Sequence, residues 1–134
     1  MRDEWFLIGR ILFSLILVGS GVGHLMQAEG SAAYATAKKI PNAMLMVQIS
    51  GVCLLAGGLA IILGIFMDLA ALLTAVLLLI MAFMMHRFWE ESDEQVQQTE
   101  MAMFMKNLSI AGGALVIFSV TSDFTPYTLT DAIF

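Results

Sequence analysis

The sequence predicts an all-α integral membrane protein, a four-helix transmembrane bundle with up-down topology. Two observations support this fold class. Of the 134 residues, 60% are hydrophobic and only 13% are charged, and the mean hydropathy is +0.89. Soluble domains carry about 25% charged residues, so the composition excludes an ordinary soluble enzyme and a disordered chain. In addition, four separate segments are long enough to cross a bilayer core about 30 Å thick.

Each predicted span satisfies the requirement for about 20 mainly apolar residues. The predicted spans are residues 5–26, 42–67, 68–87 and 103–121. Arg10 is the only formal charge in the first span, and the second span has none. The four spans occupy most of the chain, so residues 1–134 are interpreted as a single transmembrane domain.

The charges predict the surroundings and the orientation of the chain. A net charge of −5 excludes a nucleic-acid partner, because phosphate binding needs a basic surface. The lipid bilayer is the expected environment. The longer loops adjoin Lys38, Lys39, Arg87 and Lys106, whereas the opposite side has Arg2 and Arg10. Since basic residues favour the cytoplasmic side, we expect both termini to lie outside.

Small residues predict how the helices pack, because association in lipid relies on close backbone approach and polar contacts. Steps of three and four residues place Arg10, Ser14, Leu17, Gly21 and His24 on one face of the first helix. In the fourth helix the same steps select Lys106, Ser109, Gly113 and Val116. The glycines expected at helix contacts are Gly19, Gly23, Gly51, Gly58 and Gly113.

Arg10 is the one basic side chain well inside a predicted span. Ionisable groups within a membrane are candidates for function. Asp68 should lie on the same side of the membrane, so Arg10 and Asp68 form a candidate intramembrane ion pair. The alternative is that the long Arg10 side chain reaches back to the interface.

A second polar cluster is expected where three helix ends meet at one membrane face. Its members are His24, His86, Arg87, Trp89, Lys106 and Asn107. Imidazole, ammonium and amide donors would suit the carbonyls of a quinone headgroup or an anionic lipid headgroup. The alternative is that Arg87, Trp89 and Lys106 are interface anchors and that the histidines are polar helix ends.

No cofactor is firmly implied by the sequence, and a quinone is the possible one. His24, His86 and Cys53 lack the spacing of a metal motif, so no metal site is predicted, and no residue is assigned as catalytic. The acidic run at residues 90–94 is interpreted as a solvated loop.

The stretch His86-Arg87-Phe88-Trp89, a spacer with Gln97-Gln98, and residues 104–113 resemble the second half of the DoxX family. Arg10 and Gly57-Gly58 support the resemblance, which covers roughly residues 5–120. It implies a small four-helix protein of the bacterial inner (plasma) membrane with links to redox systems. The positions carried over are Arg10, His86, Trp89, Lys106 and Asn107, whereas Cys53-Leu54 stands where many members carry an acidic residue.

The resemblance and the residues together support three hypotheses about function. We expect a non-catalytic accessory or anchoring subunit of a redox-linked complex, associated with other membrane protein subunits. The alternative is a quinone-reactive oxidoreductase acting on thiosulfate or another sulfur compound, with His86 and Lys106 at the headgroup. A small transporter or lipid-binding protein is a second alternative, although glycine- and alanine-rich helix faces leave little room for a polar pathway.

Overall fold

The computed structural model describes residues 1–134, and its regular elements are all helices. They are α1 (Arg2–Met26), α2 (Ala28–Ala37), α3 (Ala43–Leu63), α4 (Met67–Met85), the short 3₁₀ helix η1 (Phe88–Glu90) and α5 (Glu94–Thr121). Four of them, α1, α3, α4 and α5, are long and apolar enough to cross a membrane. The predicted helical class and the predicted number of spans are therefore confirmed.

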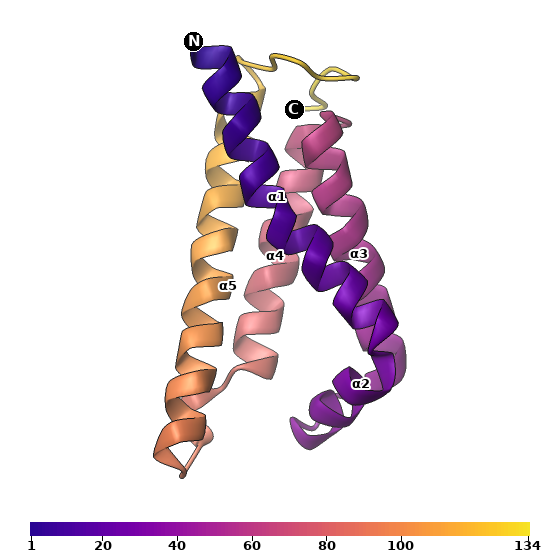
Figure 1. The fold of residues 1–134 in the computed structure, drawn as a ribbon, viewed down its shortest axis with the longest axis vertical. Coiled ribbons are helices and arrows are strands. Elements are labelled where there is room, and N and C mark those ends of the chain that lie inside the picture. The colour runs from indigo at the N-terminus through magenta and orange to yellow at the C-terminus, as the bar shows by residue number, and fades with distance from the viewer.

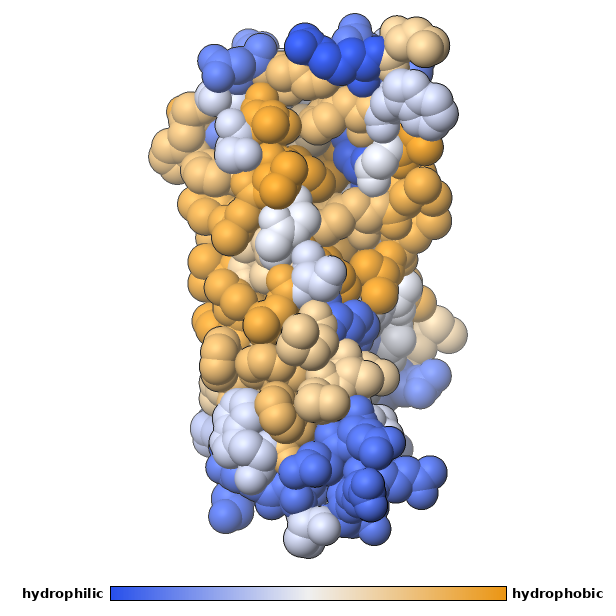
Figure 2. Space-filling model, turned by 90° about the vertical axis from the view of Figure 1, so that its left-hand side faces the viewer, coloured by the Kyte–Doolittle hydropathy of each residue, from blue (hydrophilic) through white to orange (hydrophobic).

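The molecule has two polar ends and an apolar middle. Figure 1 shows the N- and C-termini at one end, with α2 and the turn between α4 and α5 at the other. In Figure 2, hydrophobic residues form a band across the middle of the visible face, and hydrophilic residues gather at both ends. This distribution is typical of a bundle that spans a bilayer, because the lipid core contacts only the middle of the molecule.

Two helix boundaries differ from the sequence prediction by four residues or more, for local reasons. Helix α5 begins at Glu94, well before residue 103, because the Asp93 side chain caps it by accepting a hydrogen bond from the Val96 N–H at 2.9 Å. Its 28 residues extend about 42 Å, more than the bilayer core requires. Helix α3 ends at Leu63 because Gly64 adopts a left-handed φ of 66°.

Helices α1 and α3 approach each other through glycines. A Cβ at Gly21 would lie 2.6 Å from the backbone nitrogen of Leu55 and 2.7 Å from the carbonyl oxygen of Gly51. A Cβ at Gly58 would lie 2.9 Å from a methyl carbon of Val18. Side chains at these positions would push the helices apart, so Gly51 and Gly58 are contact positions as predicted.

The expectation for Gly19 and Gly23 is wrong. A Cβ at either residue would meet nothing within 4 Å. Two residues along a helix correspond to a rotation of about 200°, so both glycines point away from the face that carries Gly21. That face is the one expected from periodicity, since Arg10, Ser14, Leu17 and Gly21 are the buried residues of α1.

Helices α4 and α5 pack along each other through alanines. Ala71, Ala75 and Ala82 of α4 are fully buried, as are Ala111 and Ala114 of α5. The buried face of α5 is thus rotated by about one residue from the predicted one, and Ser109 and Val116 are exposed. Gly113 still makes a close contact, because its Cβ would lie 3.0 Å from the Phe13 ring.

Replacing Gly21 by alanine tests the α1–α3 contact. We expect Gly21→Ala to lower the free energy of unfolding by about 1–3 kcal/mol, because the added methyl group collides with backbone atoms of α3. Gly19→Ala is the matched control: it adds the same methyl group without a collision, and alanine favours the helix. Reversible unfolding of the purified protein in detergent measures both variants. Equal losses would contradict this packing.

Candidate functional site

Four of the six residues of the predicted polar cluster line one cavity of about 160 Å³. They are His24, His86, Lys106 and Asn107. Helix α1 supplies His24, the end of α4 supplies His86, and α5 supplies Lys106 and Asn107. Apolar side chains such as Leu54 and Met81 complete the wall. The cavity therefore combines several polar groups with an apolar surround, a combination typical of small-molecule sites.

Both imidazole rings are held through Nδ1. The Ser50 hydroxyl donates to the Val47 carbonyl at 2.9 Å, so its oxygen accepts from His24 Nδ1–H, 3.0 Å away. His86 Nδ1 lies 2.8 Å from a carboxylate oxygen of Glu100, which can only accept from it. Nε2 is therefore the free nitrogen of each ring. A neutral ring offers an acceptor there, and a protonated ring offers a donor.

Asn107 lines the cavity and has a buried amide nitrogen without a partner. The residue is only 2% exposed, and its Nδ2 has no hydrogen-bond partner within the protein. Leaving a buried donor unsatisfied costs about 1–3 kcal/mol. Lys106 also lines the cavity and forms no ion pair. The two residues together offer hydrogen bonds to an oxygen acceptor.

Arg87 and Trp89 do not line this cavity, so the predicted six-residue cluster is divided. Helix α4 ends at Met85, and the chain then turns into η1 and directs these side chains elsewhere. Arg87 donates from Nη2 to the Lys38 carbonyl at 3.0 Å. Trp89 is half-exposed and packs edge-on against Phe88 and Phe104.

Glu100, a buried carboxylate outside the predicted polar cluster, connects the cavity to its rim. Glu100 is 6% exposed and accepts hydrogen bonds from the Tyr34 hydroxyl and from His86. Lys38 Nζ lies 3.3 Å from the same carboxylate and 2.5 Å from Glu91. Helix α2 is thereby tied to α5 beside His86. The sequence feature that indicates a buried Glu100 is its helical register, because the residue lies on the same face of α5 as Phe104 and Asn107.

The protonation states at this rim favour the same contacts. Burial and the hydrogen bond to Glu100 raise the pKa of Tyr34, so the phenol stays protonated and donates. Burial lowers the pKa of Lys38, but the hydrogen bond to Glu91 and the charge of Glu100 outweigh it, and the net shift is upward. Lys38 therefore remains a cation beside two carboxylates.

Arg10 and Asp68 are both buried at the opposite end, but they do not form the predicted ion pair. Arg10 donates to the backbone carbonyls of Pro126, at 3.2 Å, and Tyr127. One carboxylate oxygen of Asp68 accepts from the N–H groups of Ile133 and Phe134, at 2.6 and 2.7 Å. The C-terminal segment thus supplies backbone partners to both side chains, while Arg10 Nε and Asp68 Oδ1 have no hydrogen-bond partner within the protein.

Charge reversal distinguishes this arrangement from an ion pair. We expect Arg10→Met and Asp68→Leu each to release the C-terminal segment, because backbone groups lose their charged partners. Cleavage of the tail by carboxypeptidase measures the release, and Lys39→Met at the far end is the control. The doubly exchanged protein, Arg10→Asp with Asp68→Arg, should release the tail as well. If that exchange restored the tail's resistance to carboxypeptidase, Arg10 and Asp68 would act as an ion pair, which would contradict the assignment of backbone partners.

Comparisons with known proteins identify the family. The sequence profile of the DoxX family matches residues 5–87, which include His24 and His86. The inner membrane protein YqjF of Escherichia coli (strain K12) is 33% identical over 117 residues, which cover 87% of this chain and 84% of that protein. No solved structure matches. The chain therefore belongs to the DoxX family and is a multi-pass protein of the bacterial inner membrane.

Proposed function

We propose that this DoxX-family protein is a membrane subunit of a redox-linked complex and that its polar cavity binds the headgroup of a quinone. The observation that carries the proposal is the buried Asn107 amide, a donor without a partner that lines the cavity. A quinone carbonyl would satisfy this donor. An apolar ring would in turn contact Leu54, Leu78 and Met81 on the cavity wall.

The two histidines suit both redox forms of such a ligand. Nδ1 of each ring is engaged, so only Nε2 remains for the headgroup. A neutral ring would accept a hydrogen bond from a hydroquinone hydroxyl, and a protonated ring would donate one to a quinone carbonyl. Lys106 adds a cation that favours the carbonyl oxygen as negative charge develops on it.

We further propose that the helices cross the membrane in alternating directions, with the cavity toward the cytoplasmic side. The clustering of Lys38, Lys39, Arg87 and Lys106 near that end supports this orientation. The projecting start of α5 supports an accessory role. It carries exposed Asp93 and Glu94, which would favour a partner subunit with a basic surface.

An accessory subunit and a self-sufficient oxidoreductase predict different activities. We propose the accessory role, so the purified chain should bind quinone without oxidising thiosulfate, and turnover should require a co-purifying subunit. Affinity purification in mild detergent, followed by a thiosulfate:quinone assay with and without the co-purified protein, measures this. Turnover by the chain alone would favour the oxidoreductase. A preparation without any stoichiometric partner would contradict the accessory role.

Replacing Asn107 by leucine separates binding from folding. We expect Asn107→Leu to weaken quinone binding by about tenfold, the equivalent of one lost hydrogen bond of about 1.4 kcal/mol. Its stability should be unchanged or higher, because the variant removes an unsatisfied buried donor. Quinone titration and thermal unfolding of the same preparation measure the two effects.

The control for this variant is Ser109→Leu, which changes an exposed residue of the same helix outside the cavity. It should alter neither binding nor stability. His86→Ala and Lys106→Met should also weaken binding, since both residues line the cavity. Unchanged quinone affinity in all three cavity variants would overturn the proposed site.

A further inference from the structure

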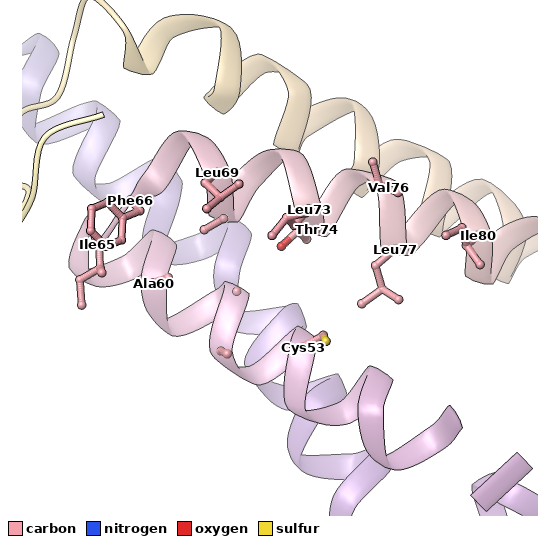
Figure 3. A pocket seen from close by; sticks show the side chains of 13 residues that line it. Cys53, Ala60, Ile65, Phe66, Leu69, Leu73, Thr74, Val76, Leu77 and Ile80 are labelled. Carbon is pink, nitrogen blue, oxygen red and sulfur yellow. The ribbon is translucent and has the colours of Figure 1, made fainter. Parts of the chain in front are cut away.

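A second hollow lies between α3 and α4, and none of its lining residues lines the polar cavity. It is a groove of about 490 Å³, and eleven of its thirteen lining residues are hydrophobic. Figure 3 shows the two helices diverging from the turn at Ile65 and Phe66, with Leu77 of α4 pointing into the space and Cys53 across from it on α3. Small residues such as Ala56 and Ala60 form the α3 wall.

The groove continues toward the other membrane face. A further apolar hollow of about 160 Å³ shares Leu77 and Ile80 with it and extends to Met85 at the end of α4. Helix α4 has 19 residues and is about 28 Å long. The combined groove therefore runs along most of the hydrocarbon thickness of a bilayer.

One residue joins this apolar groove to the polar cavity. Met81 lines both the extended groove and the cavity that contains His24 and Asn107. Methionine is unbranched and flexible, so its side chain can move aside without disturbing the helix. A polar pocket joined to a long apolar groove matches an amphiphile that has an acceptor-rich headgroup and a long tail.

We propose that the α3–α4 groove binds the isoprenoid tail of the quinone whose headgroup lies in the polar cavity. The inference rests on the proposed quinone site and specifies its ligand as a long-tailed, membrane-resident quinone. The headgroup would enter past Met81, and the tail would lie against Leu77 and the small α3 residues. A phospholipid with an acyl chain in the groove is the competing occupant, and in that case the quinone tail would bring no gain in affinity.

The test compares two quinones with the same fully substituted ring, one without a tail and one with an isoprenoid tail, and uses the full chain in lipid nanodiscs. The tail is already in lipid before binding, so each affinity is calculated from the quinone concentration within the membrane. Any remaining gain then reports packing in the groove. We expect the tailed quinone to bind about tenfold more tightly.

A groove-filling variant identifies where that gain arises. Ala60→Phe places a ring in the groove and should abolish the advantage of the tail while leaving the affinity of the tail-less quinone unchanged. Leu59→Phe is the matched control. Leu59 is the neighbour of Ala60 in the sequence, but its side chain is exposed and does not line the groove. Its tail advantage should equal that of the wild type.

Cys53 gives a measurement that needs no groove substitution. It is the only cysteine, is exposed, and lines the groove. The tailed quinone should slow its alkylation by a membrane-permeant maleimide, and the tail-less quinone should not. Equal alkylation with both, or a tail advantage that survives Ala60→Phe, would overturn the groove assignment alone. Failure of the tail-less quinone to bind would overturn the headgroup site, and the tail assignment with it.

Discussion

The close approach of α1 and α3 at Gly21 and Gly51 is the contact on which the cavity depends. Lipid provides little hydrophobic drive for helix association, so the helices must gain stability from direct backbone packing. The same contact places His24, since a Cβ at Gly51 would lie only 2.9 Å from the His24 Cβ. A bulkier residue at either glycine would move α1 outward and carry the first cavity histidine with it.

The second constraint is that buried polar groups in a bilayer must find partners inside the protein. The two ends of the bundle solve this differently. At one end the C-terminal backbone pairs with one side of the Arg10 guanidinium and with one carboxylate oxygen of Asp68, and at the other Glu100 accepts from Tyr34 and His86. The first arrangement holds the C-terminal segment onto the bundle, and the second holds α2 onto α5. Between them the cavity retains free donors, which is the condition for binding an acceptor from the membrane.

Sequence reasoning succeeded where a feature depends on neighbours along one helix. Apolar length predicted four spans, and the period of the helix predicted the buried face that includes Gly21. It failed where irregular segments decide the outcome. The partner of Arg10 is a folded-back tail, and Trp89 leaves the cluster because the chain turns after α4. Glu100 was assigned to no site from the sequence, although its register on α5 matches the buried face.

The Asn107 amide is also the most direct reporter of quinone binding in the polar cavity. The chain has only two asparagines, Asn42 and Asn107, and Asn42 is exposed at the start of α3. Selective ¹⁵N labelling of asparagine therefore gives two side-chain amide signals, one in the cavity and one as an internal reference. Upon addition of quinone, we expect a shift of the Asn107 Nδ2 signal and no change at Asn42. A quinone that binds without moving the Asn107 signal would contradict the proposed headgroup site.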